Sequence, residues 1–260
     1  MQFAANLSLL FTEYPLLERF DRAAAAGFTG VEFFFPYGLP EADLTAALTR
    51  NGLELVLFNV PMGDWDAGER GLAAQPDREA EFRAGVERAA HWASVLRPQR
   101  VNSPTGPAGP GPAARDTLLR NLTFAAERLR AVGTPLSLEP INRTDVPGAA
   151  VATVAEAVAV LDEIGDPDLG IQYDLYHSLM EGEDPGAVLA EHLPRIRHVQ
   201  IADVPGRHQP GTGAVDFPAF LDRLEGGGYD GWVSLEYHPD GPTEDSFAAF
   251  GPHGPRATGR

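Results

Sequence analysis

The sequence contains no cysteine and no lysine. Without cysteine the chain forms no disulfide and offers no thiolate, so thiolate catalysis and cysteine-based zinc or iron–sulfur sites are excluded. All 20 basic residues are arginine, so no lysine is available for a Schiff base with a substrate or with pyridoxal phosphate. No amine base remains except the N-terminus.

Long apolar runs and excess positive charge are also absent. No uninterrupted apolar run approaches the roughly 18 residues of a membrane span. The N-terminus has no basic start typical of a signal peptide and soon reaches Glu13 and Pro15. We therefore expect a soluble cytoplasmic protein without a membrane partner. The net charge of −17 repels phosphate backbones, so we expect no nucleic-acid partner either.

The length of 260 residues suits one (β/α)8 TIM barrel, which takes roughly 250 residues. Short apolar segments alternate with segments of helical periodicity, which predicts a parallel sheet covered by helices. The expected strands are 3–6, 30–34, 53–59, 100–102, 135–138, 170–174, 198–203 and 232–235. The expected helices are 15–27, 41–50, 77–92, 114–132, 153–165, 185–193, one beginning near 218, and 244–250.

An open, doubly wound sheet is the alternative arrangement of such elements. It would carry a glycine-rich phosphate loop after an early strand, and residues 6–8 have no such glycines. We therefore predict a single α/β barrel domain over residues 1–250 and a disordered tail over residues 251–260. The long segments 60–76 and 103–113, rich in glycine and proline, are expected to be loops of that barrel.

Four oxygen-bearing side chains recur at the ends of predicted strands. They are Glu139, Asp174, Gln200 and Glu236, separated by 35, 26 and 36 residues. This spacing is close to the roughly 30 residues of a βα unit, and active sites of barrels lie at these strand ends. Three carboxylates about 4 Å apart repel by roughly 4 kcal/mol per pair at a dielectric near 20. They must take up protons or bind a cation, and an all-oxygen set favours Mg²⁺ or Mn²⁺.

Short motifs surround these residues along the chain. They include Asn6-Leu7-Ser8, Val31-Glu32-Phe33, Gly63-Asp64-Trp65, Gly68-Glu69-Arg70-Gly71, Leu138-Glu139-Pro140-Ile141-Asn142, Gln200-Ile201-Ala202-Asp203, Pro210-Gly211-Thr212-Gly213 and Glu236-Tyr237. With them, nearly the whole chain resembles the hydroxypyruvate isomerase family of xylose isomerase-like barrels. The resemblance implies that Glu139, Asp174, Gln200 and Glu236 bind a divalent metal. Gln200 stands where related ketose 3-epimerases carry histidine, which favours the isomerase branch.

The resemblance implies an intramolecular oxidoreductase of glyoxylate metabolism, which interconverts hydroxypyruvate and tartronate semialdehyde. Its catalytic pair would be Glu139 and Glu236. One glutamate removes a proton beside the polarised carbonyl, giving an enediolate, and the other returns a proton to the adjacent carbon. The sequence does not decide which glutamate acts first.

The implied ligand is a small anionic carbonyl compound, so an acidic protein needs a local cation to bind it. Arg207 is the first candidate and Arg70 the second. His177 matches a histidine of the superfamily that binds substrate oxygen, and Asp145 matches a substrate-binding acid of the epimerases. The long loops leave room for a homodimer.

The chain departs from the family pattern at two places. Ala214 stands where the family usually carries an acidic residue, and the stretch 102–106, with Pro104, has more proline than we expect after the fourth strand. We expect altered loop packing or substrate preference from both, with the four proposed ligands unaffected.

Several rival functions use the same fold. They are a ketose 3-epimerase, a 2-oxo-tetronate or other sugar isomerase, an inosose dehydratase, an endonuclease, and a metal-dependent sugar-binding protein without activity. The endonuclease needs several histidine ligands and a basic face, which the proposed ligand set and the charge of −17 do not provide. Metal binding without proton exchange from a bound ligand would identify the non-enzymatic binding protein.

Overall fold

The computed structural model describes residues 1–109 and 111–248. Eight parallel strands follow one another around a closed barrel, and the eighth pairs with the first. They are β1 (Gln2–Asn6), β2 (Gly30–Glu32), β3 (Glu54–Asn59), β4 (Arg100–Asn102), β5 (Leu136–Leu138), β6 (Gly170–Asp174), β7 (Ile196–Ile201) and β8 (Trp232–Leu235). This confirms the predicted barrel and excludes the open sheet.

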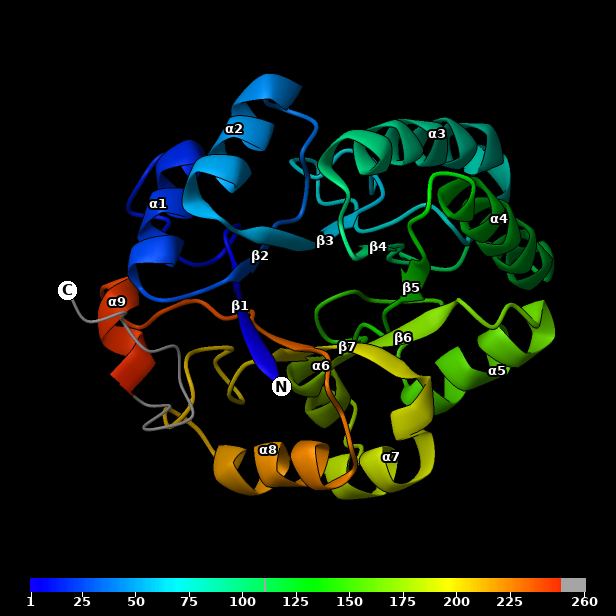
Figure 1. Ribbon diagram of the computed structural model, residues 1–260. Helices are drawn as coiled ribbons and strands as arrows, with labels where there is room; N and C mark the ends of the chain where they lie inside the picture. The colour runs from blue at the N-terminus through cyan, green and yellow to red at the C-terminus, as the bar shows by residue number, and fades with distance from the viewer. Residues whose placement is uncertain (110, 249–260) are drawn as a thin grey trace.

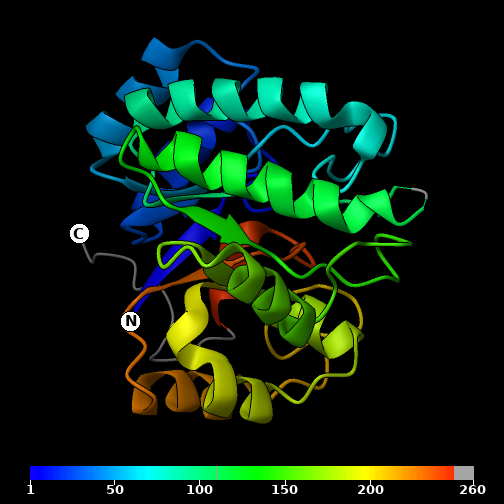
Figure 2. The same cartoon turned by 90° about the vertical axis from the view of Figure 1, so that its right-hand side faces the viewer.

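Helices surround the strands (Figure 1). They are α1 (Leu16–Ala25), α2 (Glu41–Asn51), α3 (Glu79–Leu96), α4 (Ala113–Arg130), α5 (Val154–Ile164), α6 (Leu175–Met180), α7 (Pro185–His192), α8 (Phe217–Gly226) and α9 (Thr243–Ser246), with 3-10 turns at Pro76–Arg78 and Leu193–Arg195. The two longest, α3 and α4, pack side by side (Figure 2). None of the helices within the described part of the chain is both long and apolar enough for a membrane crossing.

Local sequence signals explain most of the helix boundaries. The predicted capping box opens α5, where the Thr153 hydroxyl accepts a hydrogen bond from the Glu156 backbone N–H at 3.2 Å. The helix ends at Gly165, whose φ of 70° suits glycine. The core lies between the barrel and these helices, where apolar side chains such as Phe20, Val86 and Leu122 are fully buried.

Two expected strands and two expected helices have other bounds in the structure, and one helix was not expected. β2 ends at Glu32 rather than at 34, and β7 runs over Ile196–Ile201 rather than 198–203. The helix expected at 77–92 begins as a 3-10 turn and continues to Leu96, because apolar side chains still face the barrel there. The short helix α6 was not among the expected helices; it follows β6 directly, with no turn residues to announce it. The last helix ends at Ser246, and the predicted tail at 251–260 lies outside the described residues.

Candidate active site

Buried polar side chains mark the C-terminal end of every strand. They are Asn6, Glu32, Asn59, Asn102, Glu139, Asp174, Gln200 and Glu236, in chain order from β1 to β8. All four predicted ligands belong to this ring. Sequence reasoning did not assign a role to the three asparagines or to Glu32, although each is the polar residue that ends an apolar strand.

A cavity of about 110 Å³ lies at this end of the barrel. Six of the eight predicted site residues line it: Arg70, Glu139, Asp145, His177, Arg207 and Glu236. Asp174 and Gln200 do not line it but contact residues that do. The rest of the wall is mostly apolar and consists of Phe34, Met62, Trp65, Pro104, Ile141 and Val146, with the polar Asn59.

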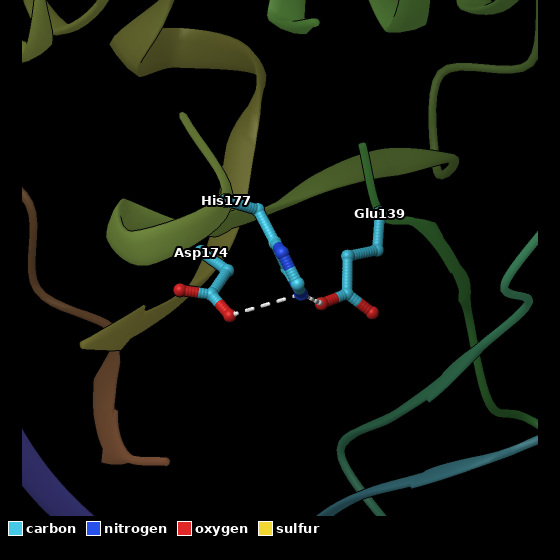
Figure 3. Close-up of side chains that lie close together, drawn as sticks. All are labelled: Glu139, Asp174 and His177. Carbon is cyan, nitrogen blue, oxygen red and sulfur yellow. Dashed lines mark ion pairs between the residues drawn. The ribbon is translucent and has the colours of Figure 1, made fainter. Parts of the chain in front are cut away.

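Glu139, Asp174 and His177 form a compact group (Figure 3). The His177 Nε2 atom lies 3.5 Å from Asp174 Oδ2 and 3.9 Å from Glu139 Oε1. One potential ligand atom from each residue lies within 4.8 Å of the others. Burial, and secondarily the charge of Asp174, raises the pKa of Glu139 to about 8. Burial also raises the pKa of Asp174.

The hydrogen bonds of Asn142 fix the tautomer of His177. The Asp145 backbone N–H donates to Asn142 Oδ1 at 2.8 Å, so the Asn142 amide group turns its N–H bonds the other way. They reach Asp145 Oδ2 at 3.0 Å and His177 Nδ1 at 2.6 Å. Burial lowers the pKa of His177 well below its usual value, so the ring is neutral. Its single proton therefore lies on Nε2, which points between Glu139 and Asp174.

Replacing Asn142 by aspartate is expected to move this proton to Nδ1, because a carboxylate can only accept there. The ¹⁵N chemical shifts of His177 would report the switch, and activity should fall about 10- to 100-fold, as for other groups that orient a site residue. Asn142→Ala, which offers no acceptor, should lose activity without forcing the Nδ1–H form. An unchanged tautomer in Asn142→Asp, in a folded protein, would contradict this role.

Arg207 is placed by the loop after β7. The carboxylate of Asp203 organises this loop by accepting four backbone N–H bonds, from Val204, Val215, Gly211 and Gly213. Arg207 adopts a φ of 53° within it. Ala214 is exposed there and donates its backbone N–H to the Val204 carbonyl at 3.3 Å. The loop therefore forms without an acidic residue at that position.

The Arg207 guanidinium lies across two carboxylates, 2.5 Å from Glu236 Oε1 and 3.2 Å from Asp174 Oδ2. Burial opposes its charge, but Glu236 and Asp174 outweigh this and raise the pKa of Arg207. Burial raises the pKa of Glu236 well above its usual value, against the effect of Arg207. Arg207 is thus already paired with two buried carboxyl groups, those of Glu236 and Asp174.

Gln200 lies within a buried network under Glu236. Its Nε2 donates to Glu32 Oε1 at 2.8 Å and to Glu236 Oε2. Asn6 Nδ2 makes the same two contacts, at 2.9 Å to Glu32 and 2.8 Å to Glu236. The oxygen of Gln200 is turned to Gln172 Nε2, 2.7 Å away. Gln200 therefore lies beside Glu236, another predicted ligand, but turns its N–H group towards it. The role of Gln200 as a metal ligand stays a prediction.

The composition of the site suits a divalent cation. Three buried carboxyl groups, from Glu139, Asp174 and Glu236, gather around one paired guanidinium. Burial raises the pKa of all three, and their mutual repulsion adds to this for Glu139 and Glu236, so their ionised forms need a compensating charge. Oxygen donors with one neutral imidazole nearby can hold such an ion. The buried Glu/Asp/His group thus supports metal binding.

Comparisons with known proteins agree with this architecture. The profile of the xylose isomerase-like TIM barrel family matches residues 20–251. The 2-oxo-tetronate isomerase of Cupriavidus necator is 42% identical over 97% of this chain and 98% of its own. The hydroxypyruvate isomerase of Escherichia coli is 41% identical over 97% and 99%.

A solved structure is similar over the full length of both chains. It comes from Brucella melitensis, is described as an AP endonuclease of family 2, and superposes with a TM-score of 0.93 at 40% identity, covering 98% of this chain and 100% of that one. In residues 1–109 and 111–248 the acidic group includes only one histidine, unlike a site rich in histidine ligands. With these full-length similarities, the chain belongs to the xylose isomerase-like TIM barrels and, among them, to the family of hydroxypyruvate and 2-oxo-tetronate isomerases.

Proposed function

We propose that this isomerase interconverts hydroxypyruvate and tartronate semialdehyde by proton transfer between two glutamates. The observation that carries the proposal is that Glu139 and Glu236 line one small cavity from different strands, both buried and both with raised pKa. A carboxyl group whose pKa is raised towards the working pH can both accept and donate protons.

Each glutamate has one oxygen held by amide groups. Glu139 Oε2 accepts from Asn102 Nδ2 at 2.8 Å, and Glu236 Oε2 accepts from Asn6 and Gln200. The other oxygen of each, Oε1, faces His177 or Arg207. The amides therefore orient both carboxyl groups, and Oε1 of each is the oxygen that would carry the proton; that of Glu236 is ion-paired with Arg207.

The reaction needs two proton movements. One glutamate removes a proton from C3 of hydroxypyruvate, and the electron pair of that C–H bond forms the C2–C3 double bond of an enediolate. The other glutamate delivers a proton to C2, while the proton of the C3 hydroxyl passes to the C2 oxygen and leaves an aldehyde at C3. The Nε2–H of His177 is a suitable donor to a substrate oxygen during this exchange, and Asp145 holds Asn142 beside it.

Glu139, Asp174 and Glu236, with Gln200 and His177 beside them, would hold Mg²⁺ or Mn²⁺. Such an ion polarises a bound carbonyl group and so acidifies the neighbouring C–H bond. Because burial raises the pKa of Glu139 to about 8, loading the site would displace a proton from that carboxyl group.

A 2-oxo-tetronate is the second candidate substrate. Its isomerisation uses the same proton transfer, and the chain is almost equally similar to an isomerase of that name and to a hydroxypyruvate isomerase, at 42% and 41% identity. Identity alone therefore does not rank the two acids.

The test is to follow both acids and a ketohexose by NMR with Mg²⁺ or Mn²⁺ present. We expect kcat/KM for hydroxypyruvate to exceed that for the 2-oxo-tetronate, and the ketohexose to react slowest because the cavity is only about 110 Å³. A higher kcat/KM for the 2-oxo-tetronate would move the assignment to the second candidate. Epimerisation of the ketohexose as the fastest reaction would overturn both.

A further inference from the structure

The two arginines of the cavity differ in what they contact. Arg207 is paired with Asp174 and Glu236. Arg70 has no carboxylate within ion-pair distance among residues 1–109 and 111–248; its NH1 donates to the backbone carbonyls of Trp65 at 3.1 Å and Glu69 at 2.8 Å. Arg70 therefore brings to the cavity a positive charge that forms no ion pair with a described carboxylate.

Arg70 is held in place by its own loop. Its guanidinium carbon lies 3.7 Å from the centre of the Trp65 ring, a cation–π contact that orients the planar group. The neighbouring Glu69 is occupied elsewhere, since it pairs with Arg78 and accepts the Asp64 backbone N–H at 2.6 Å. Arg70 is thus held in place without an ion pair to a described carboxylate.

The next residue anchors the loop to the proline-rich segment after β4. Gly71, with a φ of 133°, approaches the backbone so closely that a Cβ there would lie 2.5 Å from both Gly106 N and Pro104 O. This contact needs glycine, because any side chain would clash with backbone atoms that cannot move aside. It sets Arg70 beside the loop that supplies Pro104 to the cavity wall.

The size of the cavity links Arg70 to the catalytic carboxyl groups. The cavity has a volume of about 110 Å³, so its walls lie close together. A molecule of three or four carbons that reaches Glu139 and Glu236 therefore also reaches the other walls. Phe34 and Met62 offer no donor or positive charge for a carboxylate end group, Asn59 is neutral, and Arg207 is paired with Asp174 and Glu236. Arg70 is the guanidinium of the cavity that pairs with no described carboxylate.

We propose that Arg70 receives the carboxylate of the substrate and thereby selects 2-oxo acids over neutral ketoses. The assignment rests on the proposed function for its substrate class. A guanidinium matches a carboxylate in shape and charge. Because the Arg70 side chain is already held against Trp65, it loses less conformational entropy when the substrate binds. Arg207, by contrast, stays with the acidic group.

Calorimetry with two unreactive analogues tests this assignment on the protein loaded with Mg²⁺ or Mn²⁺. Glycerate and glyceramide differ in the charge of one end group. We expect Arg70→Gln to weaken glycerate binding roughly 10²-fold and to change glyceramide binding less than about 3-fold, with Arg70→Lys retaining part of the glycerate affinity. Arg22→Gln is the matched control: Arg22 also lies over an aromatic ring, 4.1 Å from the centre of Tyr14, but outside the cavity, and its loss should change neither affinity.

Equal weakening of both analogues, or unchanged glycerate binding in Arg70→Gln, would overturn the assignment. So would a selective loss of glycerate in Arg207→Gln with none in Arg70→Gln. Hydroxypyruvate turnover is measured separately. A wild-type protein that binds glycerate through Arg70 but does not isomerise hydroxypyruvate would refute the proposed function and leave the role of Arg70 standing.

Discussion

Glu139→Gln and Glu236→Gln are each expected to lower kcat for hydroxypyruvate by about 10³-fold or more. Glutamine keeps the shape of the side chain and can still fill its place among the amides, but it cannot take up a proton from carbon. General acid–base catalysis contributes about 10²- to 10⁴-fold, and loss of a carboxylate also weakens cation binding. Steady-state kinetics with saturating Mg²⁺ or Mn²⁺ measures the effect on kcat.

A control on the same barrel separates chemistry from folding. Glu54 is exposed at the start of β3, at the opposite end of the barrel from the cavity, so Glu54→Gln should keep wild-type activity. Circular dichroism should show the same fold for all three variants. If either cavity variant kept activity within about 10-fold of wild type, that glutamate would not be one of the two proton carriers.

Removal of divalent cations by a chelator is expected to lower the isomerisation rate at least about 10³-fold, with recovery on adding Mg²⁺ or Mn²⁺. The physical reason is that charge stabilisation by such an ion contributes several kcal/mol to the transition state. Full activity in the chelated protein, with metal content checked by elemental analysis, would contradict the cation's role.

The chelated protein should also show a particular dependence of stability on pH. The pKa of Glu139 is about 8 in the folded chain, where burial raises it, against about 4.3 in an unfolded chain. The folded state therefore binds the proton more tightly, so this contribution to stability is fully present below about pH 4.3 and is lost as the pH rises towards 8. Glu139→Gln cannot ionise and escapes that loss.

The expected result is that the melting temperature of metal-free Glu139→Gln rises relative to wild type as the pH increases from 5 to 8. A difference of several degrees is reasonable, because about 1 kcal/mol shifts the melting temperature by about 2–4 °C at this size. Addition of the cation should make the wild type melt at a higher temperature than Glu139→Gln, since the cation stabilises the ionised wild-type carboxylate. Parallel melting curves for the two metal-free proteins would show that Glu139 titrates normally.

Much of the architecture could be read from periodicity alone. Eight apolar segments at the spacing of βα units predict the barrel, and a polar residue that follows an apolar strand predicts a position at the active end. Glu139 and Glu236 were found by this rule. Asn6 and Glu32 obey it too, but an asparagine or a single glutamate at a strand end carries no chemical signature by itself.

The remaining features depend on contacts between distant segments. Asn6 and Glu236 meet across 230 positions, and His198 and Glu32 across 166. The tautomer of His177 depends on Asn142, 35 positions away. No local pattern reports such contacts, because they arise only when the barrel closes.

The ranking of Arg207 and Arg70 as binding residues for an anionic substrate also depends on contacts that the sequence does not show. Its place after β7 made Arg207 the first candidate for an anionic substrate. The fold of the loop around Asp203 turns Arg207 onto Glu236 and Asp174, and that pairing is visible only in three dimensions. Arg70 was the second candidate, and it forms no ion pair with a described carboxylate.

Incorporation of solvent deuterium into hydroxypyruvate, followed by NMR with Mg²⁺ or Mn²⁺, tests the central claim most directly. Proton transfer through two glutamates predicts that deuterium enters C3 of the substrate and C2 of tartronate semialdehyde, and that this entry stops on chelation and in both Glu139→Gln and Glu236→Gln. Product whose C2 hydrogen came from substrate C3 without any solvent deuterium would indicate a hydride shift and contradict the account. Absence of any reaction in a folded, cation-loaded protein would contradict it as well.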